Sequence, residues 1–231
     1  LLSLNSTILP RTSYTISIGE LDEIGSKLND AESYSILKVK LGTPRMDKEI
    51  ITEIRRHTDK LIRVDANEGW AKDGALEMSF WLADRNVEFI EQPFPAKDLN
   101  ASIELKKRSP LEIFADENSL SSNDIKPIRH AFHGINIKLM KCGSLDEGKK
   151  MINIARENGL KVMLGCMVET SVGITNASHL AGEVDFVDLD GNLLIKNDPY
   201  SGVIVNDGRL VLPKRGGSGV TLNSDYSDTL R

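Results

Sequence analysis

Residues Leu61–Asp65 read LIRVD, a short apolar run that ends in an acid and passes at once into the polar sequence Ala66-Asn67. Short apolar runs that pass into polar sequence recur about every 25 residues, which is the length of one strand and helix unit in a β/α barrel. The runs are rich in Val, Ile, Leu and Phe, as expected of strands buried in a parallel sheet. The other predicted strands are 12–17, 35–40, 87–91, 111–116, 134–138, 161–165 and 184–188. Eight such strands predict an α/β fold of the TIM barrel type.

Apolar residues return at helical spacing between these runs, and the predicted helices have recognisable ends. Asp73 is a candidate cap for one helix, and the segment 121–124 offers several caps for another. Ser144 followed by Glu147 has the pattern of a capping box. Gly159 stands where the next helix should end, because glycine favours the conformation that follows a last helical turn.

Length and composition fit a single barrel and exclude several classes of protein. The 231 residues are 40% hydrophobic, enough for one large core. A net charge of −5, with no basic run interleaved with aromatics, argues against a nucleic-acid partner. No apolar stretch approaches the roughly 20 residues that span a membrane. Two cysteines, Cys142 and Cys166, are too few for a disulfide framework and favour a reducing compartment. We therefore expect a soluble, cytoplasmic protein with a small-molecule substrate, and a homo-oligomer is compatible with the sequence.

Three acids stand at or just after successive strand ends: Asp65, Glu91 and Asp116. In a β/α barrel all these ends face one rim, so the three carboxylates should lie side by side. They would repel one another unless a cation neutralised them, and hard oxygen ligands suit Mg²⁺ or Mn²⁺. Any one of the acids alone is more simply a surface carboxylate or a salt-bridge partner. Their common place in the repeat favours a divalent metal site.

Lysines accompany the acids at the same rim. Lys38 and Lys40 alternate along one strand, so both side chains point to the same face. Lys138 ends the sixth predicted strand, across the barrel from the second. Two such amines facing each other over a bound substrate can remove and return a proton on opposite faces of one carbon. Without the acids, lysines that merely cover the barrel end would be the better interpretation.

The ordered set of motifs resembles the barrel signature of the enolase superfamily, in its muconate lactonizing subgroup. The resemblance runs from about Thr12 to Gly219 and implies a (β/α)7β barrel. The motifs that carry it are Lys38-Val39-Lys40, Asp65-Ala66-Asn67, Glu91-Gln92-Pro93, Asp116-Glu117 and Asn136-Ile137-Lys138.

This resemblance implies a role for each charged residue. The Mg²⁺ ligands would be Asp65, Glu91 and Asp116. Lys40 and Lys138 would be the two acid/base residues, and Lys38 would help hold the substrate carboxylate. Metal and lysine together stabilise the charge that develops on that carboxylate when the α-proton leaves as an enolate forms. The implied reaction is a racemisation or an epimerisation.

A further resemblance narrows the substrate. Asp188-Leu189-Asp190 is similar to the Asp-x-Asp pair with which dipeptide epimerases bind the free α-ammonium of a dipeptide. Alternation places both aspartates on one face, where they suit a cation, although a pair that caps the strand end is the alternative. These matches favour an L-Ala-D/L-Glu epimerase or a relative acting on another dipeptide. The further predicted substrate contacts are Thr15, Met167 and Glu169.

The chain departs from that family at its N-terminus. Members carry an N-terminal α+β capping domain, whereas this chain starts at Leu1 almost directly before the first predicted strand. We expect a barrel over 1–192 and a C-terminal segment, 193–231, that packs back toward the missing domain. A hairpin is predicted around Asn206-Asp207-Gly208.

Other functions fit parts of the pattern. An N-acylamino acid racemase or an o-succinylbenzoate synthase would share the lysines and the metal site but would not need Asp188 and Asp190. A muconate cycloisomerase is disfavoured for the same reason. A catalytically silent barrel, retained for assembly, is the alternative of another class, and the intact set of charged residues argues against it.

Overall fold

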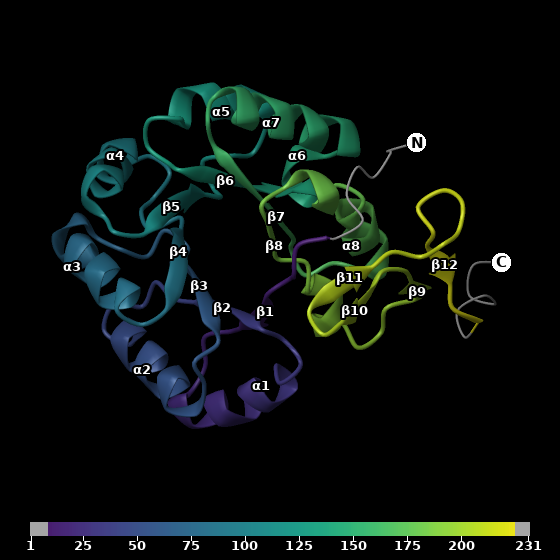
Figure 1. Cartoon of the computed structure of the whole chain (residues 1–231), viewed down its shortest axis with the longest axis horizontal. Coiled ribbons are helices and arrows are strands. Elements are labelled where there is room, and N and C mark those ends of the chain that lie inside the picture. The colour runs from purple at the N-terminus through teal and green to yellow at the C-terminus, as the bar shows by residue number, and fades with distance from the viewer. Residues whose placement is uncertain (1–8, 225–231) are drawn as a thin grey trace.

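The computed structural model describes residues 9–224. Within them, eight parallel strands follow one another in chain order around a barrel, as Figure 1 shows, and helices cover the outside. The ring closes where Thr12 bridges Val187 in parallel, and the Ser13 amide donates to the Val187 carbonyl at 3.3 Å. The predicted (β/α)7β barrel is confirmed. The strands are β1 Tyr14–Ile16, β2 Ile36–Lys40, β3 Leu61–Asp65, β4 Val87–Glu91, β5 Glu112–Ala115, β6 Gly134–Lys138, β7 Lys161–Gly165 and β8 Phe186–Val187.

A helix follows each of the first seven strands, and the predicted starts and ends are mostly confirmed. Ser144 accepts from the Glu147 amide at 3.1 Å, and the Asp124 carboxylate accepts from the Ser121 amide at 2.8 Å. Gly159 has φ 70°, directly after the last helical turn. The helices are α1 Ile24–Asp30, α2 Asp47–His57, α3 Lys72–Ala83, α4 Leu99–Arg108, α5 Ser122–Ile128, α6 Leu139–Cys142, α7 Leu145–Glu157 and α8 Ser171–Ser178. None of those within residues 9–224 is long and apolar enough to cross a membrane.

The predicted cap at Asp73 is wrong. Helix α3 begins at Lys72, directly after Ala71, which adopts the extended conformation without a side-chain cap. Asp73 lies inside the first turn with ψ 124°, and Gly74 has φ 84°, so the backbone is kinked there. The non-helical backbone at Asp73 and Gly74 interrupts the first turn of α3, and Asp73 is not the N-cap of the helix.

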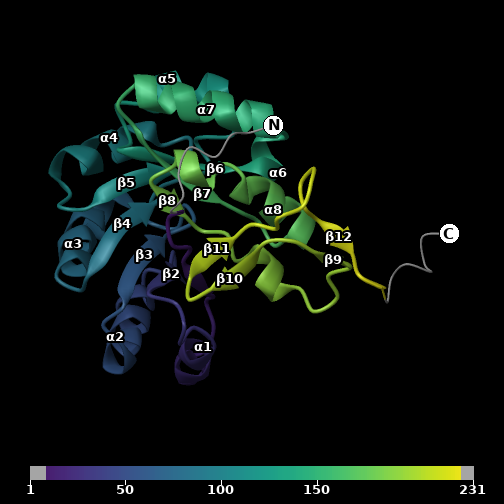
Figure 2. The same cartoon turned by 45° about the vertical axis from the view of Figure 1, so that its right-hand side comes forward.

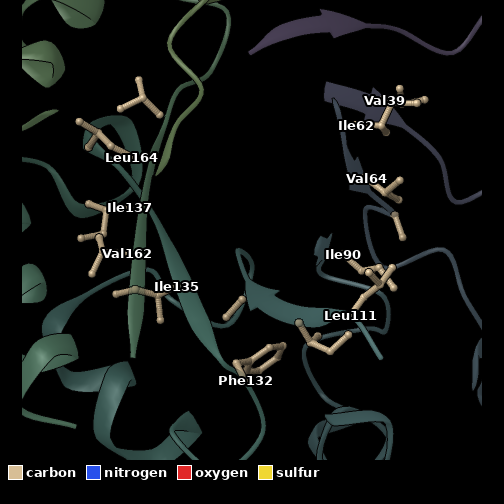
Figure 3. Close-up of a cluster of buried hydrophobic side chains, with 14 of the residues drawn as sticks. Val39, Ile62, Val64, Ile90, Leu111, Phe132, Ile135, Ile137, Val162 and Leu164 are labelled. Atoms are coloured by element: carbon tan, nitrogen blue, oxygen red, sulfur yellow. The ribbon is translucent and has the colours of Figure 1, made fainter. Parts of the chain in front are cut away.

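Alternation along the strands separates an outer apolar layer from the barrel interior. Val39 and Ile137 are fully buried in the cluster that packs under the helices. Figure 3 shows part of this cluster on and beside the strands. Because neighbours along a strand face opposite sides, Lys38 and Lys40 point into the barrel, as do Asn136 and Lys138.

Aromatic rings fill the interior at the end of the barrel where the strands begin. Phe89 lies 4.4 Å from Phe114 and 5.1 Å from Phe186, measured between ring centroids. The Arg63 guanidinium lies over the Phe186 ring at 5.0 Å. Gly134 is required beside them, because a Cβ there would collide with the Phe114 ring. These rings, with Arg63 beside them, form a floor at the end of the barrel opposite the rim that carries the acids.

The predicted C-terminal hairpin is confirmed. Strands β10 (Ile204–Asn206) and β11 (Arg209–Val211) pair in an antiparallel manner around Asp207 and Gly208, whose φ values of 49° and 72° match a two-residue turn. The Gly208 carbonyl accepts from the Thr12 amide at 2.8 Å, which fastens the hairpin to the start of β1. Figure 2 shows β9 (Tyr200–Ser201) and β12 (Thr221–Leu222), which form a second pair beyond α8. Packing of 193–231 against a capping domain stays a prediction, and 225–231 lie outside the described residues.

Candidate active site

The three acids predicted from the repeat lie together at the rim, each at most 1% exposed. Asp65 and Glu91 are direct partners in the register between β3 and β4, and Asp116 follows β5. The Lys38 ammonium lies 3.1 Å from Asp65 and 2.8 Å from Glu91. The structure therefore brings the three carboxylates together at one rim, and a lysine lies between two of them.

The two predicted acid/base lysines come from opposite sides of the barrel, because β2 and β6 are separated by three strands in either direction. Lys40 forms an ion pair with Asp65 at 2.7 Å, and Lys138 forms one with Asp116 at 2.8 Å. Both lysines line a cavity of about 450 Å³ at the rim. A small molecule in this cavity would lie between two amines.

Sequence reasoning missed two polar residues of this site. Lys141, in α6, contacts the second oxygen of Asp116 at 2.6 Å. Asn136 donates to the Glu91 carboxylate at 2.6 Å, and Gly165 leaves room for it, since a Cβ there would meet the Asn136 amide. Asn136 shares a face with Lys138 and was detectable by alternation. Lys141 was not, because it belongs to a helix that begins at the end of the strand.

A third missed residue, Gln92, joins two loops of the rim. It is fully buried, with φ 35°, directly after Glu91. Its side-chain oxygen accepts from the Asp116 amide at 2.8 Å, and its amide group donates to the Asn118 side chain at 2.7 Å. Gln92 thereby fixes the loop after β4 to the loop after β5.

The charges of the cluster are not fully balanced. Burial raises the pKa of Glu91 to about 7, helped by the neighbouring Asp65 and Asp116 carboxylates and opposed by Lys38. Burial also acts to raise the pKa of Asp65, but Lys38 and Lys40 outweigh it and hold that pKa well below its usual range. Burial alone would lower the pKa of Lys38, but the surrounding carboxylates raise it well above its usual value, so Lys38 stays charged.

The donor set fits a divalent cation by its chemistry, because carboxylate oxygens are the ligands that Mg²⁺ and Mn²⁺ prefer. Among the described residues, no three acidic, histidine or cysteine side chains surround a single point. Lys38, Lys138 and Lys141 lie between the carboxylates instead. The roles of Asp65, Glu91 and Asp116 as ligands therefore stay predictions.

The acidic pair after β8 borders the same cavity, together with Thr15 and Met167. The Thr15 amide donates to Asp190 at 2.7 Å, and Lys38 donates to Asp188 at 2.9 Å. Burial, helped by Asp188, raises the pKa of Asp190 to about 6. Two carboxylates therefore lie at one end of the cavity beside Lys38, and the binding of a substrate cation there stays a prediction.

The predicted contact Glu169 is the exception. It does not line this cavity, and its carboxylate turns back to accept from the Met167 amide at 3.1 Å. Its carboxylate also occupies the space beside Gly173, which has no side chain. A substrate contact by Glu169 stays a prediction.

Apolar side chains surround the mouth of the cavity. Leu120, Met167, Val168 and Leu194 all line it and are 46%, 46%, 64% and 51% exposed. They come from the loops after β5, β7 and β8, so the charged interior opens through an apolar rim.

Fold and charged rim together define a β/α barrel domain of the enolase type. Residues 23–226 match the family described as enolase C-terminal domain-like, and the chain belongs to this family.

Curated relatives of the chain include two named epimerases. It is 42% identical over 213 residues to the L-Ala-D/L-amino acid epimerase of Flavobacterium johnsoniae, covering 92% of this chain and 63% of the relative. It is 45% identical over 219 residues to the L-Ala-D/L-Glu epimerase of Bacteroides thetaiotaomicron, covering 94% of this chain and 57% of the relative. The chain thus spans about three fifths of the length of these relatives.

Solved structures agree in fold. A dipeptide epimerase from Cytophaga hutchinsonii, complexed with Mg and the dipeptide D-Ala-L-Val, superposes with a TM-score of 0.90 at 26% identity. That match covers 97% of this chain and 64% of the other. A dipeptide epimerase from Methylococcus capsulatus, complexed with Mg and L-Arg-D-Lys, gives 0.85 at 32% identity, covering 93% and 64%.

Proposed function

We propose that the protein epimerises a dipeptide at the α-carbon next to its terminal carboxylate, with Mg²⁺ as cofactor. The observation that carries this proposal is the placement of Lys40 and Lys138 on opposite sides of one cavity beside three buried carboxylates. The names and Mg-bound structures of the relatives support it.

The two lysines, Lys40 and Lys138, would each perform one of the two proton transfers. One lysine, as a neutral amine, takes the α-proton, and the electron pair moves into the carboxylate to form an enolate. The other lysine, as an ammonium, returns a proton to the opposite face, which inverts the carbon. Lys138 is suited to donate, because Glu91 and Asp116 raise its pKa despite its burial. Lys40 is 28% exposed and can exchange its proton with water between turnovers.

The negative charge that develops on the reacting carboxylate would lie near a permanent positive charge, the Lys38 ammonium. Lys38 stays charged and points into the barrel, so it stabilises negative charge there without becoming a base. Mg²⁺ held by Asp65, Glu91 and Asp116 would add a second positive charge next to that carboxylate.

The negative end of the cavity favours a free ammonium group on the substrate. Asp188 and Asp190 are 3% and 4% exposed there. An N-acylamino acid racemase or an o-succinylbenzoate synthase would use the same lysines, but an acylated nitrogen gains nothing from two carboxylates. The pair therefore supports a dipeptide substrate over these alternatives and over muconate cycloisomerase.

The test is α-proton exchange in D₂O, followed by ¹H NMR with a panel of dipeptides and saturating Mg²⁺. We expect exchange that is abolished by Lys138→Ala and unaffected by Lys107→Ala, which removes a surface lysine paired only with Glu104. Calorimetry of Mg²⁺ binding separates the remaining outcomes. Mg²⁺ binding without exchange of any dipeptide would contradict the proposal and favour a catalytically silent barrel.

We also propose that residues 193–231 contact a capping domain in a longer protein. Ile204 and Val211 are paired across the hairpin and are 62% and 45% exposed, which leaves an apolar face for a partner. Ile204→Lys should weaken association with a capping domain supplied as a separate chain. Equal association of the variant and the parent in a pull-down would contradict this.

A cytoplasmic location remains part of the proposal. Cys142 and Cys166 form no disulfide in the described part of the chain, which suits a reducing compartment. Fractionation of cells that express the natural protein would test the location, and size-exclusion chromatography with light scattering would establish whether it forms a homo-oligomer.

A further inference from the structure

We infer that Asp47 is a positioning residue for the site. It joins the loop after β2, which directly follows Lys40, to the loop after β3, which directly follows Asp65. Its partner in the second loop is the indole of Trp70. The link between the loops rests on contacts within the protein, whereas its effect on catalysis rests on the proposed function.

Asp47 is fully buried, although it is an acid and the first residue of helix α2. Its Oδ1 accepts from the Thr43 amide at 2.9 Å and from the Thr43 hydroxyl at 3.1 Å. The Gly42 amide lies 3.2 Å from both carboxylate oxygens. Oδ2 accepts from the Trp70 indole N–H at 2.8 Å. A buried carboxylate is stable only when such donors surround it, and here they come from two different loops.

The two loops also touch backbone to backbone. A Cβ at Gly42 would collide with the Ala66 carbonyl, and a Cβ at Gly69 would collide with the backbone of Gly42. The Gly69 amide donates to the Ala66 carbonyl at 2.8 Å, which closes the second loop into a turn. Because no side chain fits between the loops at this point, a bond that joins them has to pass beside it, as the one between Asp47 and Trp70 does.

The segment between Asp65 and Trp70 requires support from outside. Asn67 and Glu68 have φ values of 43° and 63°, a region that is unfavourable for residues with a Cβ. Such a backbone persists only where the surrounding contacts hold it. The Asn67 amide donates to Asp65 Oδ1 at 3.0 Å, and Asp65 Oδ2 accepts from Lys40 at 2.7 Å. The conformation of this segment therefore determines how the Asp65 carboxylate is aimed at Lys40.

Two substitutions break the link in different ways. Trp70→Phe keeps a buried ring and the bond from the Trp70 amide to the Pro93 carbonyl at 2.9 Å, and it removes the N–H that reaches Asp47. Asp47→Asn keeps the size of the side chain. Its amide accepts at one end only, so either Trp70 or the donors of the first loop lose their acceptor.

The first test is amide hydrogen exchange of the folded protein, measured by NMR, and it needs no turnover. In Trp70→Phe we expect the protection of the Asn67 and Gly69 amides to fall by about 10-fold, the loss of one hydrogen bond to a carboxylate. The Lys161 amide, bound to the His133 carbonyl at the other end of the barrel at 3.0 Å, should change by less than about twofold.

Trp81→Phe is the matched control, because Trp81 lies on α3 and stacks with Arg85 at 3.7 Å. It should leave the protection of the Asn67 and Gly69 amides unchanged. A uniform loss of protection in Trp70→Phe, extending to Lys161, would show a role in global stability only. That result, or unchanged protection at Asn67 and Gly69, would overturn the inference.

The second test examines the two epimers of a dipeptide separately in the D₂O exchange assay. Each epimer presents its α-proton to one of the two lysines, and Lys40→Ala identifies the epimer that Lys40 serves, because exchange from it is lost. At saturating Mg²⁺ we expect Trp70→Phe and Asp47→Asn to slow exchange from that epimer by about 10-fold, mainly in kcat, because the amine is displaced from its working position. Exchange from the other epimer should change by less than about twofold.

The possible outcomes of the second test are distinct. Equal slowing of both epimers in Trp70→Phe would overturn a positioning role on the Lys40 side of the site. If the parent exchanged no dipeptide, the proposed function would fail instead, and the protection of the Asn67 amide would still decide whether Asp47 holds the two loops together.

Discussion

The Gln92 side-chain oxygen accepts the Asp116 backbone amide at 2.8 Å, and thereby sets the distance between the loops that carry Glu91 and Asp116. Gln92→Leu keeps the approximate size of the side chain but leaves the Asp116 amide without this partner. We expect a loss of about 1–3 kcal/mol in the free energy of unfolding. Because Asp116 is also released, Mg²⁺ affinity measured by calorimetry should fall together with stability.

Asn176→Ala is the control for Gln92→Leu, because it removes one hydrogen bond, to Val172 within α8, far from the acids. It should reduce stability without changing Mg²⁺ affinity. An unchanged affinity in Gln92→Leu would contradict a positioning role for Gln92.

Lys141→Met tests the cation that sequence reasoning missed. The Lys141 ammonium lies 2.6 Å from Asp116 and opposes any cation that binds the same carboxylate. Removing it should tighten Mg²⁺ binding by roughly fivefold, or about 1 kcal/mol. Lys149→Met, which breaks a surface pair with Glu183 at 3.1 Å, should have no such effect in the same titration. Weaker binding in Lys141→Met would show that Lys141 supports the metal site instead.

The pH dependence of substrate binding should reflect Asp190. Burial and Asp188 raise the pKa of this carboxyl from 3.8 to about 6, so it loses its negative charge as the pH falls through 6. Binding of a dipeptide ammonium should weaken over that range, and Asp190→Asn should remove this part of the dependence. The folded-state pKa is raised, so the contribution of Asp190 to stability is fully present below pH 3.8 and is lost as the pH rises through about 6. Calorimetric titrations between pH 5 and pH 8, a range of about one unit below and two above that pKa, provide the measurement.

Gly134→Ala should destabilise the barrel. Its Cβ would collide with the Phe114 ring, which is itself packed against Phe89 and Phe186. Overpacking of this kind costs about 1–3 kcal/mol, visible as a lower midpoint of unfolding in urea. Gly216→Ala is the matched control, because nothing lies within 4 Å of a Cβ at that position. Equal midpoints for the two variants would show that the aromatic floor can rearrange.

The repeat in the sequence was sufficient to predict most of the barrel. Strands β3, β4, β6 and β7 have the predicted bounds, and each apolar run ends in a charged residue or glycine. Strands β1, β2, β5 and β8 are shorter than predicted, β2 by one residue. Between β8 and β1 the ladder is reduced to the bridge of Thr12 with Val187, so apolar residues there lie outside regular pairing. Helix periodicity gave no warning of the kink at Gly74.

The structure brings the predicted charged residues together, but the sequence did not indicate which of them contact one another. Strand ends identify Lys40, Asp65 and the other charged residues, because a barrel brings those ends together. Which partner each one has depends on side-chain geometry across several strands. Lys38 was predicted to hold substrate, which stays a prediction, and in the structure it binds three carboxylates, one of them six strands later in the chain order of the barrel. Gln92 and Ser13 act through loops and backbone amides, which leave no periodic signal.

The aromatic floor closes one end of the barrel interior, so the cavity at the rim opens to solvent at the other end. Phe89, Phe114 and Phe186 close the end where the strands begin, so a molecule at Lys38 arrives and departs past Leu120 and Val168 at the rim. Under the proposed function, the two epimers of one dipeptide would share that passage and exclude each other from it. Each epimer should therefore compete with the other for entry to the cavity. The direction of net conversion would then follow the relative concentrations of the two epimers in solution.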